Sequence, residues 1–541
     1  MDRRRAALGR AALLAAPLIF LALFFLYPVG SILNLGLRPE GRLDLGGFVS
    51  VFGDPDLRSV IGFTIGQAFL STVVTLALGL PAAFALSRYR FRGRTALRAL
   101  AIVPFVLPTV VVGLAFGGGE GSLPALVAAH AFFNVAVVIR VVGTAWDAVD
   151  PALEDAAEEL GAHGWRRATA VLIPLARPAI AGAATLVFLF SFTSFGAALL
   201  LAPPASPTLE VEIWRRTTQL LDLPVAAVLT IVQIAFVSLL LGLDAAIAAR
   251  GAVDQPATLA LPREPRTSGE RAFVAVTIAG LLVFIAVPLA RVVSRSLIGP
   301  AGITLDRYTH LGEGRTGGLF DIDPAAAIGT SLRTSSLATT IALLIALPVA
   351  AAVARAGSAR GAWTLIGLPL GVSAVTLGFG YVVAFHDPPL DLRGSAWLVP
   401  IAQAVVALPF VLRIVTPALA TIHRELAEQA GALGASPWRV VRDITLPVAA
   451  SVIATAAVFA FAISLGEFGA TAFLARAGRP TMPVAIVRLL GQPGAASLGQ
   501  AYAMATLLML VTAALALGLG GAAGRLTGGS RWSGGVLGHL E

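Results

Sequence analysis

Residues 150–174 read DPALEDAAEELGAHGWRRATAVLIP, and residues 423–447 read HRELAEQAGALGASPWRVVRDITLP. The two stretches align in one register, and the members of each of the following identical pairs stand 273 positions apart: Gly161 and Gly434, Trp165 and Trp438, Arg166 and Arg439, Pro174 and Pro447. One duplication explains this spacing. We therefore expect a first half at residues 1–250, a Pro-rich polar linker at 251–270 and a second half at 271–541.

The composition around these stretches is that of a membrane protein. Hydrophobic residues make up 57% of the 541 residues and charged residues only 13%, against roughly a quarter in a soluble domain. Twelve stretches of at least nineteen residues contain no Arg, Asp or Glu: 11–37, 59–87, 99–119, 121–139, 178–209, 223–243, 272–290, 334–354, 361–386, 394–412, 444–466 and 489–524. A membrane-spanning helix needs about 20 apolar residues. The sequence thus predicts an all-α integral membrane protein with about 12 transmembrane helices.

The repeat and the charges together predict a topology. Six crossings per half is an even number, so two parallel, pseudosymmetric six-helix halves are expected. If Arg3–Arg5 lie inside, most Arg fall on the cytoplasmic side, as the positive-inside rule requires. Both termini and both repeated stretches are then cytoplasmic, and the net charge of +9 needs no nucleic acid. A cleaved signal peptide is the alternative interpretation of residues 1–30.

Several chemistries are excluded by missing residue types. All 39 basic residues are Arg, so the Lys-containing Walker A loop and a lysine Schiff base are impossible. The absence of Cys excludes disulfides and thiolate metal sites. The six His are scattered, with no pair at helical metal-binding spacing. We expect no catalytic residue, metal site or cofactor in this chain.

The first repeated stretch predicts a short amphipathic helix. Asp150 is a good N-cap, and Pro151 suits the first helical position. An apolar face of small residues follows, Gly161 ends the helix, and a second helical stretch runs from Trp165 to Pro174. Such a helix, present twice, is typical of a docking site for a partner that is itself present twice. The alternative is a pair of ordinary connections kept alike by common origin.

Both stretches resemble the E-A-A-x-x-x-G loop, with its downstream L-P, of permease subunits of ATP-binding-cassette (ABC) importers. The resemblance implies the type I importer permease fold and a coupling loop at 150–174 and 423–447. By position, the coupling residues are Asp155, Ala156, Ala157 and Gly161 in the first copy and Glu428, Gln429, Ala430 and Gly434 in the second. Asp155 replaces the usual Glu and Gln429 the usual Ala, while the glycine-to-proline spacing is kept.

The resemblance also implies partners and a substrate class. Residues 67–94, 129–140, 191–214 and 464–486 look closest to thiamine permeases, which predicts thiamine as the substrate. Ferric-iron permeases share the architecture, and molybdate and sulfate permeases share the LGEFG stretch, so these substrates stay open. The expected partners are two copies of an ATPase that carries ATP and Mg, an extracytoplasmic solute-binding protein and membrane lipid. The expected location is the inner membrane.

One acidic residue falls inside an apolar segment. Glu467 follows the second repeated stretch, and buried carboxylates in membranes usually face a cavity or a partner. In the importer family this helix of each half lines the path, which gives the candidate path residues Ser464, Glu467, Phe468, Ser191, Thr193, Ser194 and Phe195. The alternative is that Glu467 pairs with an Arg or with backbone groups. His130 and Asn134 are expected to form interhelical hydrogen bonds, and Arg140 and Arg413 to snorkel.

Another class of transporter also has twelve helices in two parallel halves. In the major facilitator type, the loop after the second helix has a G-x-x-x-D-R-x-G-R pattern. Residues 87–94, SRYRFRGR, resemble its basic part but lack the acid. The repeated loops have no role in that fold, nor in a channel or scaffold. The sequence therefore favours the importer permease.

Overall fold

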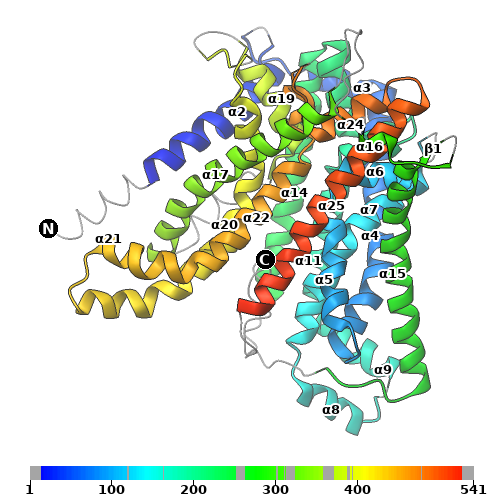
Figure 1. The fold of residues 1–541 in the computed structure, drawn as a ribbon, viewed down its shortest axis with the longest axis vertical. Helices are drawn as coiled ribbons and strands as arrows, with labels where there is room; N and C mark the ends of the chain where they lie inside the picture. The colour runs from blue at the N-terminus through cyan, green and yellow to red at the C-terminus, as the bar shows by residue number, and fades with distance from the viewer. Residues whose placement is uncertain are drawn as a thin grey trace. The chain divides into compact units, whose positions relative to one another are not determined.

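The computed structural model describes residues 14–39, 41–117, 121–162, 164–251, 262–299, 302–309, 311, 323–356, 371–386, 390–392, 394–476 and 478–526. The chain is almost entirely helical, and Figure 1 shows the elements. The helices that begin in the predicted first half or linker are η1 (Ala22–Leu26), α2 (Tyr27–Leu37), α3 (Gly46–Gly53), α4 (Pro55–Arg88), α5 (Arg94–Val106), α6 (Thr109–Phe116), α7 (Leu123–Asp147), α8 (Pro151–Glu159), α9 (Trp165–Arg167), η2 (Ala168–Leu172), α10 (Ile173–Leu175), α11 (Arg177–Phe192), α12 (Gly196–Leu201), α13 (Leu209–Arg215), η3 (Arg216–Leu220), α14 (Leu223–Gly251) and α15 (Ser268–Leu297), most of which lies in the predicted second half.

The rest of the chain contains one short pair of strands and is otherwise helical. Two antiparallel strands, β1 (Ile298–Gly299) and β2 (Gly302–Ile303), pair Ile298 with Ile303. The helices that follow are α16 (Asp306–Thr309), α17 (Pro324–Ala356), α19 (Ala374–Ala384), α20 (Leu398–Ala432), α21 (Pro437–Val440), η6 (Val441–Thr445), α22 (Leu446–Gly466), α23 (Thr471–Leu474), α24 (Met482–Leu490) and α25 (Ala495–Leu526). The fold class predicted from the sequence, an all-α membrane protein, is confirmed.

The chain forms two compact units. Unit 1 comprises residues 1–51, 213–231 and 296–541, and unit 2 comprises residues 52–212 and 232–295. In unit 2 the long helices α4, α7 and α11 pack against one another, and in unit 1 α17, α20 and α22 do the same. The same trio of helices is thus built twice. Most of α15, the first helix of the predicted second half, belongs to unit 2.

Two π-helical turns show how closely the halves correspond. Residues 168–172 form η2 and residues 441–445 form η6, again 273 positions apart. Each follows a glycine-ended loop and precedes a long helix of the packed trio. A π-helical turn is rare, so its recurrence at the same offset supports the duplication.

Glycines permit close packing of short helices in both halves. A Cβ on Gly113 of α6 would lie 2.8 Å from Leu200 of α12, and a Cβ on Gly378 of α19 would lie 2.8 Å from Phe473 of α23. Leu200 and Phe473 are themselves 273 positions apart. Small residues let helix backbones approach in membranes, where packing rather than water drives association. Both halves therefore join these short helices in the same way.

The sequence predicts about 12 transmembrane helices, and the described residues account for most of them. In the described residues nine helices are long and apolar enough to cross a membrane, or up to eleven if each bent pair is one span. The window 99–119 is bent by 98° between α5 and α6, and the window 178–209 begins after a 61° bend between α10 and α11. Pro108 and Pro178 lie beside these bends, and proline interrupts the helical hydrogen-bond ladder. The first part of the window 361–386 lies outside the described residues.

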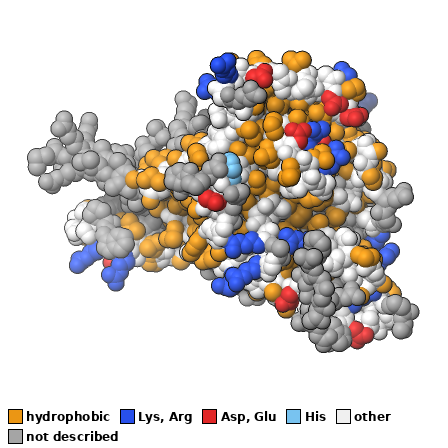
Figure 2. Space-filling model, turned by 90° about the horizontal axis from the view of Figure 1, so that it is seen from above, with side chains coloured by type: hydrophobic (Ala, Val, Ile, Leu, Met, Phe, Trp, Pro, Cys, Tyr) orange, Lys and Arg blue, Asp and Glu red, His pale blue; other side chains and the backbone are white. Residues whose placement is uncertain are grey.

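Apolar side chains also cover the outside of the long helices. In unit 2, Phe69 of α4 is 63% exposed, and Val276 and Val283 of α15 are 73% and 60% exposed. Figure 2 shows hydrophobic side chains spread widely over one face of the molecule, with Arg and acidic groups gathered in smaller clusters. Surfaces of this kind are costly in water and suit hydrocarbon surroundings.

Candidate functional site

Residues 150–174 and 423–447, for which the resemblance predicts docking of a partner, are called the first and second docking loops. The first docking loop begins with a capped helix. The Asp150 carboxylate accepts a hydrogen bond from the Ala152 amide at 2.9 Å, and Pro151 opens α8, as the sequence predicts. Asp155 and Ala156 are exposed, whereas Ala157 is buried. In Figure 1, α8 lies at the lower end of unit 2, and α9 lies beside the lower end of α15. The loop therefore projects from the end of a helix bundle.

In both docking loops the first helix ends in the same glycine motif. The Gly161 amide donates to the Glu158 carbonyl at 3.0 Å, and the Ala162 amide donates to the Ala157 carbonyl at 2.9 Å. At the second loop the Gly434 amide donates to Gly431 and the Ala435 amide to Ala430, both at 3.0 Å. This pair of bonds is the Schellman motif, which satisfies the last carbonyls of a helix.

Each glycine follows an outward-facing leucine. Leu160 and Leu433 occupy the C-cap positions, and each is 89% exposed. Both belong to the apolar faces expected from the sequence. A large apolar side chain is thus exposed at the equivalent position of both loops.

The second loop differs from its predicted form at its start. A separate short helix was expected there, but α20 runs without interruption from Leu398 to Ala432. The positions of Asp150 and Pro151 are taken here by His423 and Arg424, so the sequence lacks the N-cap and the proline that end one helix and begin another. Gln429 is exposed and Ala430 is buried. The side chains of Glu428, Trp165 and Trp438 lie outside the described residues.

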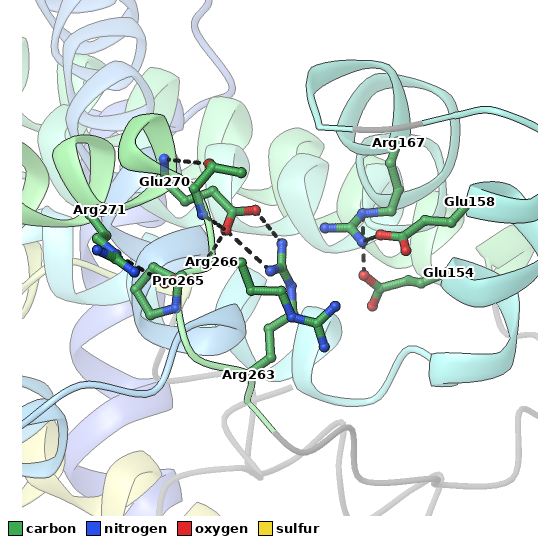
Figure 3. Close-up of polar contacts among 9 residues, drawn as sticks. Glu154, Glu158, Arg167, Arg263, Pro265, Arg266, Glu270 and Arg271 are labelled. Atoms are coloured by element: carbon green, nitrogen blue, oxygen red, sulfur yellow. Dashed lines mark hydrogen bonds and ion pairs between the residues drawn. The ribbon is translucent and has the colours of Figure 1, made fainter.

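Charged side chains attach the first docking helix to its surroundings. Arg88, the last residue of α4, forms an ion pair with Glu154 of α8 at 2.9 Å. Arg167 of α9 lies 3.6 Å from Glu154 and also pairs with Glu158 (Figure 3). Arg88 and Arg167 are 8% and 7% exposed and the Glu154 side chain is 14% exposed, so the pairs with Glu154 are largely shielded from solvent, whereas Glu158 is more exposed. Low exposure strengthens an ion pair relative to one at a surface.

The second docking loop has no counterpart of this network in its sequence. The positions 273 residues after Glu154, Glu158 and Arg167 hold Ala427, Gly431 and Val440. The two loops are thus alike in backbone at their glycine ends and unlike in charge. Sequence reasoning noted the alignment but did not draw this contrast.

Glu467 is buried, and its carboxylate is bound by the backbone. Its two oxygens accept hydrogen bonds from the amides of Ala470 at 2.7 Å and Thr471 at 3.1 Å, while the Thr471 hydroxyl donates to the Glu467 carbonyl at 2.9 Å. The carboxylate therefore caps the short helix α23, as a side chain at an N-terminus does. This is the pairing with backbone groups that the sequence left open as an alternative.

The other candidate path residues lie where α11 and α22 end. Ser191, Ser194, Phe195, Ser464 and Phe468 are buried, and Thr193 is half-buried. Gln67 of α4 donates to the Ser191 carbonyl at 3.0 Å, and Gln403 of α20 donates to the Ser464 carbonyl, also at 3.0 Å. Each half thus uses a glutamine from a neighbouring helix to hold the same carbonyl. The sequence did not single out either glutamine, because the two occupy different helices of the repeat.

His130 and Asn134 join helices of unit 2, as expected. The Ser71 hydroxyl and the His130 Nδ1 are 3.1 Å apart, and the Asn134 amide donates to the Ser191 hydroxyl at 3.3 Å. All four side chains are buried. They tie α7 to both α4 and α11. Arg140 and Arg413 are half-buried and have interaction partners.

Two buried acids escaped the sequence analysis. Glu210 and Glu212 of α13 are fully buried, and the Gln233 amide of α14 donates to the Glu210 carboxylate. Glu210 directly follows the apolar window 178–209, so in the sequence it is typical of the charged end of a membrane span rather than of a buried acid. Among the described residues, no group of three or more His, Asp and Glu side chains is placed to hold a metal ion.

Comparison with known proteins finds one relative that matches most of the chain and another that matches about a quarter of it. Its residues are 29% identical over 510 positions to the thiamine transport system permease protein ThiP of Brucella abortus (strain 2308), covering 87% of this chain and 89% of ThiP. They are 37% identical over 122 positions to the putative 2-aminoethylphosphonate transport system permease protein PhnV of Salmonella paratyphi A, covering 23% of this chain and 46% of PhnV.

A solved structure shows a partial likeness. A bacterial ABC transporter involved in the import of the acidic polysaccharide alginate matches with a TM-score of 0.40 at 17% identity, over 47% of this chain and 98% of the other.

The family model of the binding-protein-dependent transport system inner membrane component matches twice, at residues 75–250 and 338–525. One match falls in each predicted half, and together they cover most of the chain. The chain therefore belongs to the binding-protein-dependent transport inner membrane components, the permeases of ABC importers.

Proposed function

We propose that the chain forms the translocation path of an importer for thiamine, a cationic aromatic molecule, delivered by a solute-binding protein. The observation that carries the substrate assignment is the similarity to a thiamine permease through both halves in order. Family membership leaves no place for the major facilitator alternative. The chain performs transport rather than covalent chemistry.

The docking loops are the proposed contacts to the ATPase. Two equivalent loops, each with an exposed leucine beside a glycine, match a partner present in two copies. The coupling residues proposed from the sequence lie in these loops: Asp155, Ala156, Ala157, Gly161, Glu428, Gln429, Ala430 and Gly434. ATP and Mg belong to the partner, because this chain lacks the lysine of a Walker A loop. The loops then face the cytoplasm, together with both termini.

Transport would follow alternating access. Closure of two ATPase subunits on ATP moves the docking loops, and the long helices attached to them open the path to the other side of the membrane. The proposed path residues are Ser191, Thr193, Ser194, Phe195, Ser464, Glu467 and Phe468. Both Glu467 oxygens accept hydrogen bonds from backbone amides. We therefore propose that Glu467 shapes the turn beside the path and does not contact the substrate through its charge.

Replacement of the exposed leucines tests the docking proposal. Leu160→Glu combined with Leu433→Glu should abolish copurification of the ATPase while the permease itself stays folded, because neither side chain packs in the interior. Leu43→Glu, at a position that is 70% exposed and outside the apolar windows, is the control for a new charge in place of an exposed leucine. Undiminished ATPase binding by the double variant would overturn the docking assignment.

Uptake measurements test the substrate. Radiolabelled thiamine and ferric ion are supplied separately to a strain that lacks this permease and to the same strain with it restored. Restoration of thiamine uptake alone supports the proposal. Restoration of ferric uptake alone would assign the chain to the iron importers that share its architecture.

A further inference from the structure

The chain between the predicted halves returns to unit 2 as an ordered segment. The Arg263 amide donates to the Arg88 carbonyl at 3.1 Å, and the Arg90 amide donates to the Arg263 carbonyl at 2.8 Å. These bonds make a parallel bridge between Tyr89 and Arg263, directly after α4 ends. We call residues 262–267 the strap. The sequence predicted only a polar linker here, and residues 252–261 of that linker lie outside the described residues.

The strap is held by its arginine side chain as well as by its backbone. The Arg263 guanidinium lies 5.3 Å from the ring centre of Tyr89, within cation–π range. The same guanidinium donates to the two oxygens of Glu270 at 2.5 and 3.2 Å (Figure 3). Tyr89 is only 5% exposed, so the arginine covers an otherwise buried ring. A two-bond arginine–carboxylate pair fixes direction as well as distance.

Glu270 also fixes the start of α15. Its amide donates to the Thr267 hydroxyl at 3.2 Å, and its carboxylate accepts from the Thr267 amide at 3.4 Å and also from the Arg266 amide at 2.8 Å. This T-x-x-E arrangement is a capping box, which satisfies free amides at a helix start. One carboxylate therefore joins the strap to the helix that opens the second half of the sequence.

Arg88 connects this assembly to the first docking helix. Its carbonyl accepts the strap amide, and its guanidinium forms the ion pair with Glu154 of α8. The contacts run without a gap from α15 through the strap and the end of α4 to α8. All of these residues belong to unit 2. The second docking loop has Ala427 where Glu154 stands, so this connection is specific to the first loop.

We propose that Arg263 is a positioning residue that holds the end of α4, and through Arg88 and Glu154 the first docking helix, in a fixed place relative to α15. Movement of α8 is then transmitted to α4 and α15 together. The importance of this movement for transport rests on the proposed docking of an ATPase at α8. The fixed position of α8 does not depend on the proposed ATPase docking, and it can be measured on the permease alone.

Hydrogen–deuterium exchange tests the proposal on the full chain in lipid nanodiscs, without an ATPase. In Arg263→Ala, amides of residues 152–162 should exchange at least about five-fold faster than in the unmodified protein, since the helix opens more readily when its anchor is loosened. Arg263→Pro, which removes the amide bond to Arg88, should have the same effect. Arg266→Ala is the control, because among the described residues Arg266 binds Glu270 through its backbone amide, which the substitution keeps.

The second docking loop is an internal reference. Exchange at residues 429–435 should be the same in all variants, which separates loss of the strap from general unfolding. If residues 152–162 exchange equally in Arg263→Ala, Arg263→Pro and the unmodified protein, the positioning role is wrong. ATP hydrolysed per thiamine taken up should rise in Arg263→Ala with ATPase binding retained. Failure of ATPase binding in the unmodified protein would instead contradict the proposed docking function.

Discussion

Gly161 and Gly434 end their helices with nearly identical backbone conformations, with φ angles of +83° and +82°. Both lie in the left-handed region that favours glycine. An added Cβ would meet no atom within 4 Å at either position. The requirement for glycine is therefore conformational rather than steric, and it is the same in both docking loops.

Replacement of both glycines tests this requirement. Gly161→Ala with Gly434→Ala should cost about 1–2 kcal/mol at each loop end, because alanine is strained in the left-handed region. We expect reduced ATP hydrolysis on reconstitution with the partner ATPase. Asparagine tolerates this conformation, so Gly161→Asn with Gly434→Asn should keep more activity. Equal activity of the alanine and asparagine pairs would contradict the conformational explanation.

Glu467 should matter for transport through the turn that it caps. Glu467→Ala leaves the Ala470 and Thr471 amides without their acceptor, at a cost of about 1–3 kcal/mol for each buried group. Uptake should fall while the complex with the ATPase still assembles. Glu467→Gln keeps an acceptor oxygen and should retain more uptake and a higher Tm than the alanine variant. Normal uptake by Glu467→Ala would remove the residue from any role at the path.

The two buried glutamines should have equivalent effects on stability. Gln67→Leu and Gln403→Leu each remove the donor to a buried serine carbonyl and should destabilise the protein by about 1–3 kcal/mol. Thermal unfolding of the purified protein measures this loss as a lower Tm. Gln429→Leu, at an exposed position, is the matched control. A lower Tm for only one of the two buried variants would show that the halves do not share this contact energetically.

The crossing of α4 and α7 should not tolerate a side chain at Gly79. A Cβ there would lie 2.7 Å from the Val138 Cβ, so Gly79→Val must separate the helices at a cost of about 1–3 kcal/mol. Gly66 of the same helix meets nothing within 4 Å, and Gly66→Val is the control for the loss of glycine alone. The Tm of both variants checks the comparison, and equal values would contradict close packing at Gly79.

Much of this protein could be predicted from local sequence. The apolar windows gave the membrane class because hydrocarbon accepts only uncharged helical segments, and one repeated register gave the two halves. Asp150, Pro151 and Gly161 predicted the bounds of α8 because capping depends on residues within one helical turn. Missing lysine and cysteine excluded whole chemistries without any structure.

The tertiary structure decided what depends on distant partners. No local pattern shows that Gln67 and Gln403, on different helices of the repeat, hold equivalent carbonyls. Likewise, only the tertiary structure shows that the Glu467 carboxylate is bound by backbone amides and that Arg263 of the linker hydrogen-bonds to the Arg88 carbonyl. The sequence by itself determined the helices and the duplication, because these follow from periodicity and capping. Which polar groups meet was decided by the fold, because each buried group must find a partner wherever the chain places one.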